Sequence, residues 1–231
     1  MGKEGFLSAS IGRKFLMSIT GLFLVSFILV HLSLNLLLIF DDSGDLYNMG
    51  AHFMATNPAI KLMEPVLAAG FLIHIIWSFA ISLENYKARP IGYNKKTASK
   101  TKSWASTNML ILGALVLVFL VIHIYNFWYH VKIVKDLGEV TVLQAGIHVE
   151  MEDAYTLVAD LFRSSVVYCL IYIVGAVLLG FHLAHGFWSA FQTIGFNNDI
   201  WMVRLKFLAN LFAWVVAIGF SVIPLYFIIK S

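Results

Sequence analysis

The chain has 231 residues, of which 60% are hydrophobic, 15% aromatic and only 13% charged, and its mean hydropathy is +0.82. Soluble globular domains carry about 25% charged residues, so this composition excludes that class and indicates an integral membrane protein. The net charge is +3, and the single cysteine, Cys169, has no second thiol with which to form a disulfide or a thiolate metal cluster.

Five apolar segments follow one another along the chain. Each is long enough to cross a hydrocarbon layer of about 30 Å, which takes about 20 helical residues. Because lipid offers the backbone no hydrogen-bond partners, each segment must be a helix. The sequence therefore predicts an all-α integral membrane protein, a five-helix transmembrane bundle forming one domain over 1–231. The predicted spans are 15–40, 62–84, 104–130, 162–191 and 206–229.

The charges of the connecting segments predict the orientation of the bundle. The N-terminal segment and the loop 86–103 are basic, whereas 41–45 and 131–160 are rich in Asp and Glu. Since Lys and Arg concentrate in cytoplasmic loops, the N-terminus is predicted to be cytoplasmic and the C-terminus outside. The first span is too long for a signal peptide and lacks a cleavage site, so we interpret it as an uncleaved helix. The basic residues are Lys3, Arg13, Lys14, Lys87, Arg89, Lys95, Lys96, Lys100 and Lys102.

Histidines recur inside the predicted spans, where an ionisable side chain is costly and indicates a functional site by default. A single buried imidazole is as often a structural hydrogen-bonding group. Here four of the five spans carry at least one, which favours a shared role. These residues are His31, His74, His123, His182 and His185.

Depth divides four of these histidines into two pairs. His31 and His123 lie nine and seven residues before the outer ends of their spans, which at 1.5 Å per residue is roughly 10 to 14 Å inside the boundary. His74 and His182 each lie ten residues before the inner ends of theirs, about 15 Å inside that boundary. We therefore expect one pair near each face of the membrane.

Two histidine pairs at two depths fit two stacked haems b. Two axial imidazoles make the iron six-coordinate, which favours electron transfer over oxygen binding, and bundle cores are where such cofactors lie. Gly70 and Gly113 are small enough to admit a porphyrin edge, although close helix packing explains each equally well.

Two other kinds of site are less consistent with the sequence. Four imidazoles divided between two depths cannot form one tetrahedral zinc site. A proton-coupled transporter needs carboxylates or broken helices at the midplane, whereas Pro65 and Pro224 lie near span ends. A haem-free transporter or scaffold nevertheless remains an alternative from a different functional class.

Around these histidines the chain resembles one family, the single-chain, five-helix di-haem cytochrome b membrane anchor of bacterial succinate dehydrogenases and fumarate reductases. The resemblance covers nearly the whole chain in helix count and histidine order. Its motifs are VHLSLN around His31, AHFMATNP in the first outer loop, LIHIIWS around His74, VIHIYNFW around His123 and FHLAHGFWSAFQTIG around His182.

The resemblance implies specific ligands and partners. It makes His74 and His182 the ligands of the inner haem iron and His31 and His123 those of the outer one. A flavoprotein with FAD and an iron–sulfur subunit would bind on the cytoplasmic face of a bacterial inner membrane, and menaquinone would react near the outer haem. The anchor itself performs no dicarboxylate chemistry, and the direction, succinate oxidation or fumarate reduction, stays open. The haem anchor of another quinone-linked dehydrogenase, such as a hydrogenase or formate dehydrogenase, is an alternative.

Several further residues have two interpretations each. Some fumarate reductases of the family carry a proton-conducting glutamate two residues before the fourth ligand, where this chain has Gly180, so that route is not supported. His130 and Glu64 are candidates for a quinone site, although both also suit a solvated helix end. His185 is predicted to have at most a supporting, propionate-facing or partner-facing role. The other residues considered were His52 and His148, as solvated side chains, and Arg13 and Arg204, as contacts to haem propionates or partner subunits.

Overall fold

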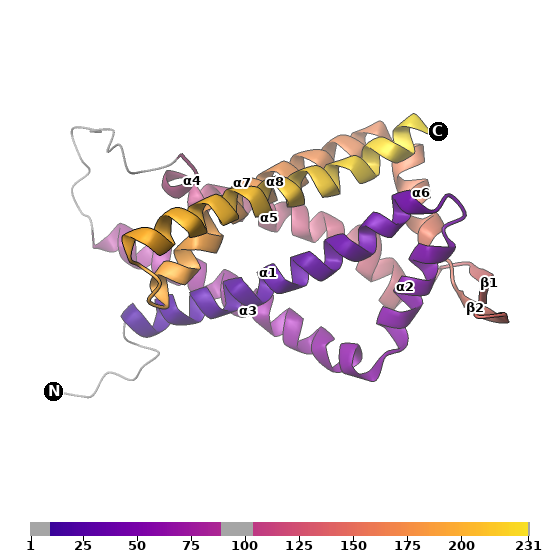
Figure 1. Ribbon diagram of the computed structural model, residues 1–231, viewed down its shortest axis with the longest axis horizontal. Helices are drawn as coiled ribbons and strands as arrows, with labels where there is room; N and C mark the ends of the chain where they lie inside the picture. The colour runs from indigo at the N-terminus through magenta and orange to yellow at the C-terminus, as the bar shows by residue number, and fades with distance from the viewer. Residues whose placement is uncertain (1–9, 89–103, 231) are drawn as a thin grey trace.

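The computed structural model describes residues 10–88 and 104–230 (Figure 1). Six of the basic residues from which the orientation is predicted lie outside these described ranges. The residues concerned are Lys3, Arg89, Lys95, Lys96, Lys100 and Lys102.

Five helices are long and apolar enough to cross a membrane within the described ranges, so the protein is an all-α membrane bundle with small additions. Large apolar side chains such as Leu72 and Trp214 are 60% and 66% exposed along them, which is expected where the surrounding solvent is lipid. The five are α1 (Ser10–Phe40), α3 (Pro58–Lys87), α5 (Met109–His123) continued by the π-helix η1 (Ile124–Val134), α7 (Val166–Thr193) and α8 (Asp199–Ile229).

Two of the predicted spans begin too early. The third was placed from 104, but a separate short helix, α4 (Trp104–Thr107), precedes α5. The fourth was placed from 162, but its first residues belong to α6 (Ala154–Ser164). Ser165 is extended there and its side chain accepts a hydrogen bond from the backbone N–H of Tyr168, so the spanning helix begins only at Val166.

The third spanning helix changes its geometry after His123. From Ile124 to Val134 the backbone forms a π-helix, and the N–H of Lys135 donates to the carbonyl of His130, five residues back, at 2.7 Å. Periodicity does not predict such a segment, because π-helices are rare and usually a single turn long. The span consequently reaches 134 rather than the predicted 130.

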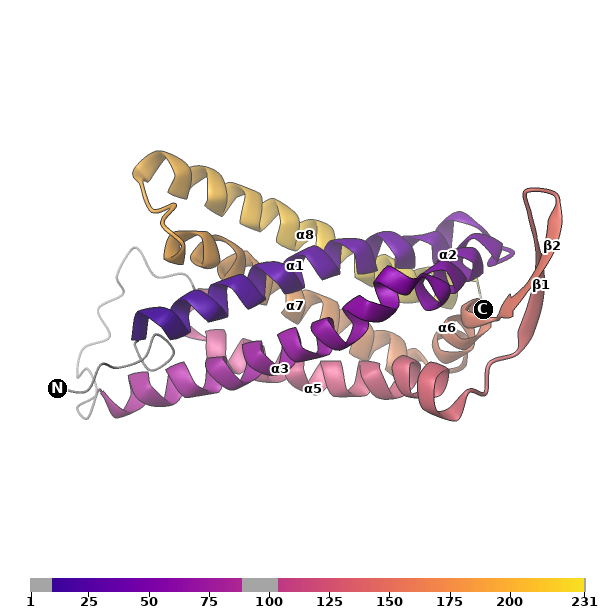
Figure 2. The same cartoon turned by 90° about the horizontal axis from the view of Figure 1, so that it is seen from below.

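One end of the bundle carries structure that the sequence analysis did not predict. There α2 (Asp45–Thr56), α6 and a hairpin of β1 (Glu139–Gln144) and β2 (Ile147–Glu152) lie together beyond the ends of the long helices (Figures 1 and 2). The strands are antiparallel and joined by Ala145 and Gly146, both with positive φ (50° and 83°), as a two-residue hairpin turn requires. We call this the hairpin end.

A buried asparagine joins the two short helices of the hairpin end. Asn48 of α2, 2% exposed, donates to Asp153 Oδ1 at 3.1 Å and accepts from the N–H of Tyr155 at 2.8 Å. Asp153 also caps α6 by accepting from the N–H of Thr156. This network fixes α2 against the start of α6 and makes the two helices one cover.

Helices α7 and α8 pack closely at Gly180. A Cβ at this position would lie 2.9 Å from Ala217 Cβ and 3.2 Å from the Ala213 carbonyl oxygen. There is no room for a longer side chain unless α8 moves, so close packing is the physical reason for glycine here.

Candidate functional site

The four histidines that depth divides into pairs lie on four different helices, α1, α3, α5 and α7. The structure brings together the same pairs that depth predicts. The ring centroids of His74 and His182 are 6.3 Å apart, and those of His31 and His123 are 5.6 Å apart. We call the first pair and its surroundings the inner site and the second pair the outer site, after the faces that the charges predict.

The ring separations suit one metal ion between each pair. Imidazole nitrogens bind metals at about 2 Å, and with roughly 1 Å more from each nitrogen to its ring centre, two rings on opposite sides of one ion have centroids about 6 Å apart. Across residues 10–88 and 104–230, no three His, Cys, Asp or Glu side chains gather to hold a metal ion. Each pair thus offers two ligands only, and a metal between them needs its other ligands from a non-protein group.

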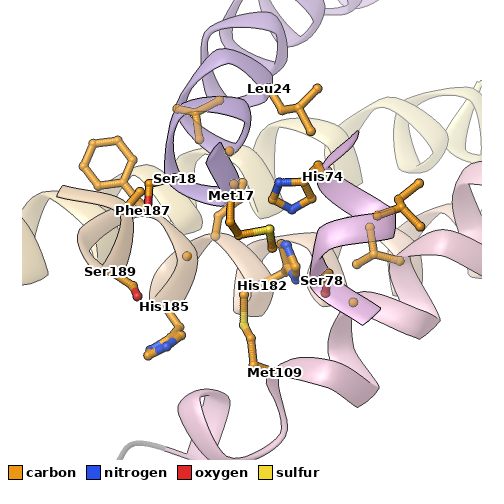
Figure 3. A pocket seen from close by; sticks show the side chains of 18 of the residues that line it. Met17, Ser18, Leu24, His74, Ser78, Met109, His182, His185, Phe187 and Ser189 are labelled. Carbon is orange, nitrogen blue, oxygen red and sulfur yellow. The ribbon is translucent and has the colours of Figure 1, made fainter. Parts of the chain in front are cut away.

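The inner site opens into a cavity of about 400 Å³ lined by α1, α3, α5 and α7. Figure 3 shows His74 and His182 directed toward one another, with the flexible side chains of Met17 and Met109 reaching into the same space. The cavity volume falls within the range of about 300–1,000 Å³ that is usual for small-molecule sites. Its other polar lining residues are Lys14, Ser18, Ser78, His185, Ser189 and Thr193.

Two residues of α1 that the sequence analysis missed contact His74. Thr20 Oγ1 lies 3.4 Å from His74 Nδ1, and a Cβ on Gly21 would lie 3.5 Å from His74 Cε1. The available signal was a polar residue, Thr20, inside the inner half of an apolar span. Thr20 precedes His31 by eleven residues, about 16 Å along the helix, and is therefore level with His74.

The two glycines considered for a porphyrin edge have different surroundings. A Cβ on Gly113 would lie 3.6 Å from His182 Cε1, and Gly113 lines the inner cavity. A Cβ on Gly70 would instead lie 2.9 Å from Phe23 Cε1. Gly70 therefore serves the packing of α3 on α1, whereas Gly113 leaves space beside a histidine.

Aromatic rings surround the histidines of the outer site. His31 stacks on Phe27 with centroids 5.1 Å apart, and the ring of His123 lies within 6.0 Å of Phe119, Phe127 and Tyr172. The cavity between them is only about 140 Å³, below the usual range of ligand sites. The outer site is therefore much more tightly packed than the inner one.

The cover at the hairpin end closes the outer site. Val158 and Phe162 of α6 line its cavity and are 5% and 3% exposed. They project from the same helix whose start is tied to α2 by Asn48. The short helix thus separates the outer histidines from the water beyond this end.

His185 does not join either pair. Its ring lies edge-on to Trp188 with centroids 4.8 Å apart, and Figure 3 shows it apart from His74 and His182. Lys206 of α8 lies over the ring of Trp188 at 5.0 Å. His185 still lines the inner cavity, which is compatible with the supporting role that the sequence suggests.

The two candidates for a quinone site lie on opposite faces of η1. Glu64 accepts hydrogen bonds from Trp128 Nε1 at 3.1 Å and from Lys132 Nζ at 2.9 Å. His130, midway between these two residues, points to the other face and pairs with Asp136 at 3.0 Å. The structure does not bring Glu64 and His130 together.

The remaining candidates have local partners. Arg13 forms an ion pair with Glu84 between α1 and α3, and Arg204 lies over the ring of Trp201 at 5.6 Å. His148 is exposed and faces Leu143 across the hairpin. The other residue, His52, is half-buried on α2.

Comparisons with protein-family models, with curated proteins and with solved structures found no match for this chain. The class of the protein is defined by its fold and site alone. It is a multi-pass, all-α membrane bundle whose interior holds two histidine pairs at different depths.

Proposed function

We propose that this protein is an electron-transfer membrane subunit that binds two haems b, the cytochrome b anchor of a succinate:quinone oxidoreductase. The observation that carries the proposal is the pairing of four histidines from four helices into two facing couples, with ring centroids 6.3 and 5.6 Å apart. Such couples supply the two axial ligands of a six-coordinate haem. The family motifs around all four histidines add the assignment to this class of complex.

The cavity of the inner site supports the placement of one haem there. His74 and His182 would hold the iron, and the cavity beside them is of ligand size. Met17 and Met109 are flexible and can yield space to a macrocycle. The hydroxyls of Ser18 and Ser189 line the same cavity; that of Ser18 donates to the carbonyl of Lys14 at 3.0 Å and so can only accept from a ligand.

The outer site fits a haem only if aromatic side chains move. His31 and His123 would hold the iron, but the cavity of about 140 Å³ is small. Phe27, Phe119 and Phe127 contact these histidines and would have to turn aside. Once turned, the same rings would enclose the macrocycle and keep water out.

A bound haem supplies one-electron transfer at its iron. The chain contributes the axial imidazoles and a dry interior. Two centres at these depths would carry electrons most of the way across the bilayer. The chain does not contribute the proton-conducting carboxylate of some fumarate reductases, because Gly180 occupies that position and a Cβ there already meets α8.

Charge supports the proposed orientation. The hairpin end carries a group of acids together with Lys61, Lys132, Lys135, Arg163 and Lys230, whereas Arg13, Lys14, Lys87, Arg204 and Lys206 lie near the opposite ends of their helices. The positive-inside rule counts Lys and Arg, and by sequence six further basic residues of the N-terminal segment and the loop 86–103 favour an outward-facing hairpin end. The basic end would then face the cytoplasm of a bacterial inner membrane, where the flavoprotein and iron–sulfur subunits would bind. The acids are Asp136, Glu139, Glu150, Glu152, Asp153 and Asp160.

Menaquinone is the proposed electron partner near the outer site. Because Glu64 and His130 face opposite sides of η1, they belong to different surfaces of the hairpin end. Only one of them can therefore contact a given quinone head group. Separate Glu64→Gln and His130→Asn variants, assayed for quinone reduction, would show which surface is used.

The test is the cofactor content of the complex purified through this chain from its native membrane. A pyridine haemochrome assay should give two haems b per chain, and flavin and iron–sulfur subunits that interconvert succinate and fumarate should co-purify. Absence of haem from the assembled complex would refute the cytochrome assignment. Two haems with a different dehydrogenase attached would keep the cytochrome and overturn the succinate assignment.

A further inference from the structure

Thr20 on α1 supplies a hydroxyl to a histidine on another helix. Its Oγ1 lies 3.4 Å from His74 Nδ1. The same hydroxyl donates its hydrogen to the backbone carbonyl of Leu16 at 2.8 Å, with the carbonyl of Met17 at 3.1 Å. Threonine in a helix commonly bonds back to the preceding turn in this way.

This geometry determines which nitrogen of His74 carries the hydrogen. A hydroxyl has one hydrogen, and Thr20 uses it on its own helix. Toward His74 it can therefore only accept, so Nδ1 must be the donor. The backbone carbonyl of Met17, on the same turn of α1, also accepts a hydrogen bond from the His74 ring. The neutral ring then has its lone pair on Nε2, which is the nitrogen left free to bind a metal.

The next residue, Gly21, makes room for the same ring. A Cβ there would lie 3.5 Å from His74 Cε1 and 3.8 Å from Nδ1, which is ordinary contact distance. Alanine would therefore fit, but a longer side chain would meet the imidazole. Thr20 and Gly21 together hold one edge of the ring against α1.

The other ring of the inner site has no such hydroxyl. His182 Nδ1 is buried and has no hydrogen-bond partner among the described residues, although Gly113 leaves space beside its ring. The two axial positions of the inner site therefore differ: one imidazole has a fixed tautomer and the other does not.

We propose that Thr20 and Gly21 are positioning residues that hold His74 as the Nδ1–H tautomer with Nε2 available to the inner haem iron. The role toward iron rests on the proposed function; the tautomer does not. A hydrogen bond donated by the distal ring nitrogen makes a ligating imidazole more basic. A more basic ligand stabilises ferric iron, so the hydroxyl keeps the reduction potential of the inner haem low.

The first experiment examines the full chain made without haem. Nitrogen-15 NMR of labelled histidine separates the two neutral tautomers, and His74→Gln identifies the signal. We expect the Nδ1–H form in the wild type and in Thr20→Ser, and a shift toward Nε2–H in Thr20→Val. Thr20→Ala, which adds no atoms, gives a second measurement with the same expectation. Ser26→Ala is the matched control, since Ser26 bonds back to Phe23 on the same helix but is exposed. An Nε2–H wild type, or a tautomer unaffected by loss of the hydroxyl, would overturn the proposal.

The second experiment measures the potential of the inner haem in the assembled complex. Loss of the hydroxyl in Thr20→Val should raise the ferrous-to-ferric ratio about tenfold at fixed potential, equivalent to about 59 mV for one electron, and Thr20→Ser should restore it. An unchanged potential would overturn the role toward iron. A wild type that carries no haem but shows the expected tautomers would refute the proposed function and leave the tautomer assignment standing.

Discussion

The inner and outer sites use the same pair of side chains but differ in what surrounds them. Beside His74 and His182 there is a cavity of about 400 Å³, bordered by Gly21, Gly113 and several hydroxyls. Beside His31 and His123 the cavity is about 140 Å³ and its walls are mainly aromatic. The inner site therefore has space for a ligand beside its histidines, whereas the outer site has little.

The difference follows from what each site borders. The inner cavity is lined by four long helices, whose small residues leave space beside the rings. The outer cavity is also closed by α6, with Val158 and Phe162 packed into it. The cover keeps water away from the outer histidines, and its side chains also reduce the volume of the cavity beside them. The following predictions test this contrast, beginning with the largest expected effect.

If the proposed function holds, replacing His182 with leucine should remove the inner haem and reduce the content from two haems per chain to one. Without His182 the iron would lose one of the two imidazoles proposed to hold it. The pyridine haemochrome assay measures the content, and His185→Leu, on the same helix, should keep both haems. Retention of two haems by the His182 variant would disprove the pairing of His74 with His182.

Gly113→Leu should fill the inner cavity and lower the haem content toward one, with the remaining haem in the outer site. A Cβ on Gly113 would lie 3.6 Å from His182 Cε1, so the further atoms of a leucine side chain would clash with the imidazole ring. Gly113→Ala is the matched control and should bind both haems, because its Cβ makes only an ordinary contact. Low-temperature difference spectra would distinguish the two haems, and equal loss of both would contradict a local effect.

Asn48→Ala should destabilise the cover of the outer site by about 1–3 kcal/mol, the cost of leaving buried polar groups without a partner. Asp153 and the N–H of Tyr155 lose their bonds to it. Thermal unfolding in detergent measures the change, with Gln144→Ala on the exposed hairpin as the control. We expect the spectrum of the outer haem to broaden while that of the inner haem does not.

Phe27→Leu should perturb the outer haem alone. It removes a ring that stacks on His31, centroids 5.1 Å apart, and that would enclose the outer haem once turned aside; aromatic contacts of this kind contribute about 0.5–1.5 kcal/mol. Redox titration of both haems checks this: the outer potential should change and the inner one should not. Phe187→Leu on α7 is a comparison variant near the inner cavity. A change in the inner potential of the Phe27 variant would mean that the sites are not independent.

Acid below the usual pKa of an aspartate, about 3.9, should loosen the cover of the outer site. Partial burial raises the pKa of Asp153, but hydrogen bonds from Thr156, Asn48 and Tyr155 outweigh it and bring the pKa below its usual value. A carboxyl whose folded pKa is lowered stabilises the fold above its usual pKa, and this contribution is lost as the pH falls through the folded pKa. Hydrogen exchange of α6 should therefore increase at acid pH, less so in Asp153→Asn. The same acid dependence in that variant would exclude this carboxyl as the cause.

The number and order of the long helices could be predicted from the sequence, because 20 apolar residues in lipid permit no other backbone structure. The pairing of histidines could also be predicted, since helical rise converts residue number into depth. The ends of the helices could not be predicted from apolar content. The fourth spanning helix begins at Val166 because Ser165 before it is extended and caps it. The cover of α2, α6 and the hairpin was missed because its segments are short and amphipathic and its stability depends on contacts such as Asn48 with Tyr155, 107 positions apart.

By itself, the sequence determined that this protein lies in a membrane, how often it can cross it and at which depths its histidines lie. These properties depend on local hydrophobicity and on distance along one helix. Only the tertiary structure decided that Thr20 contacts His74, that Gly113 faces a ring while Gly70 faces Phe23, and that Glu64 and His130 lie on opposite sides of η1. The rotation of each helix about its axis decides such contacts, and that rotation depends on the packing of neighbouring helices rather than on any single one.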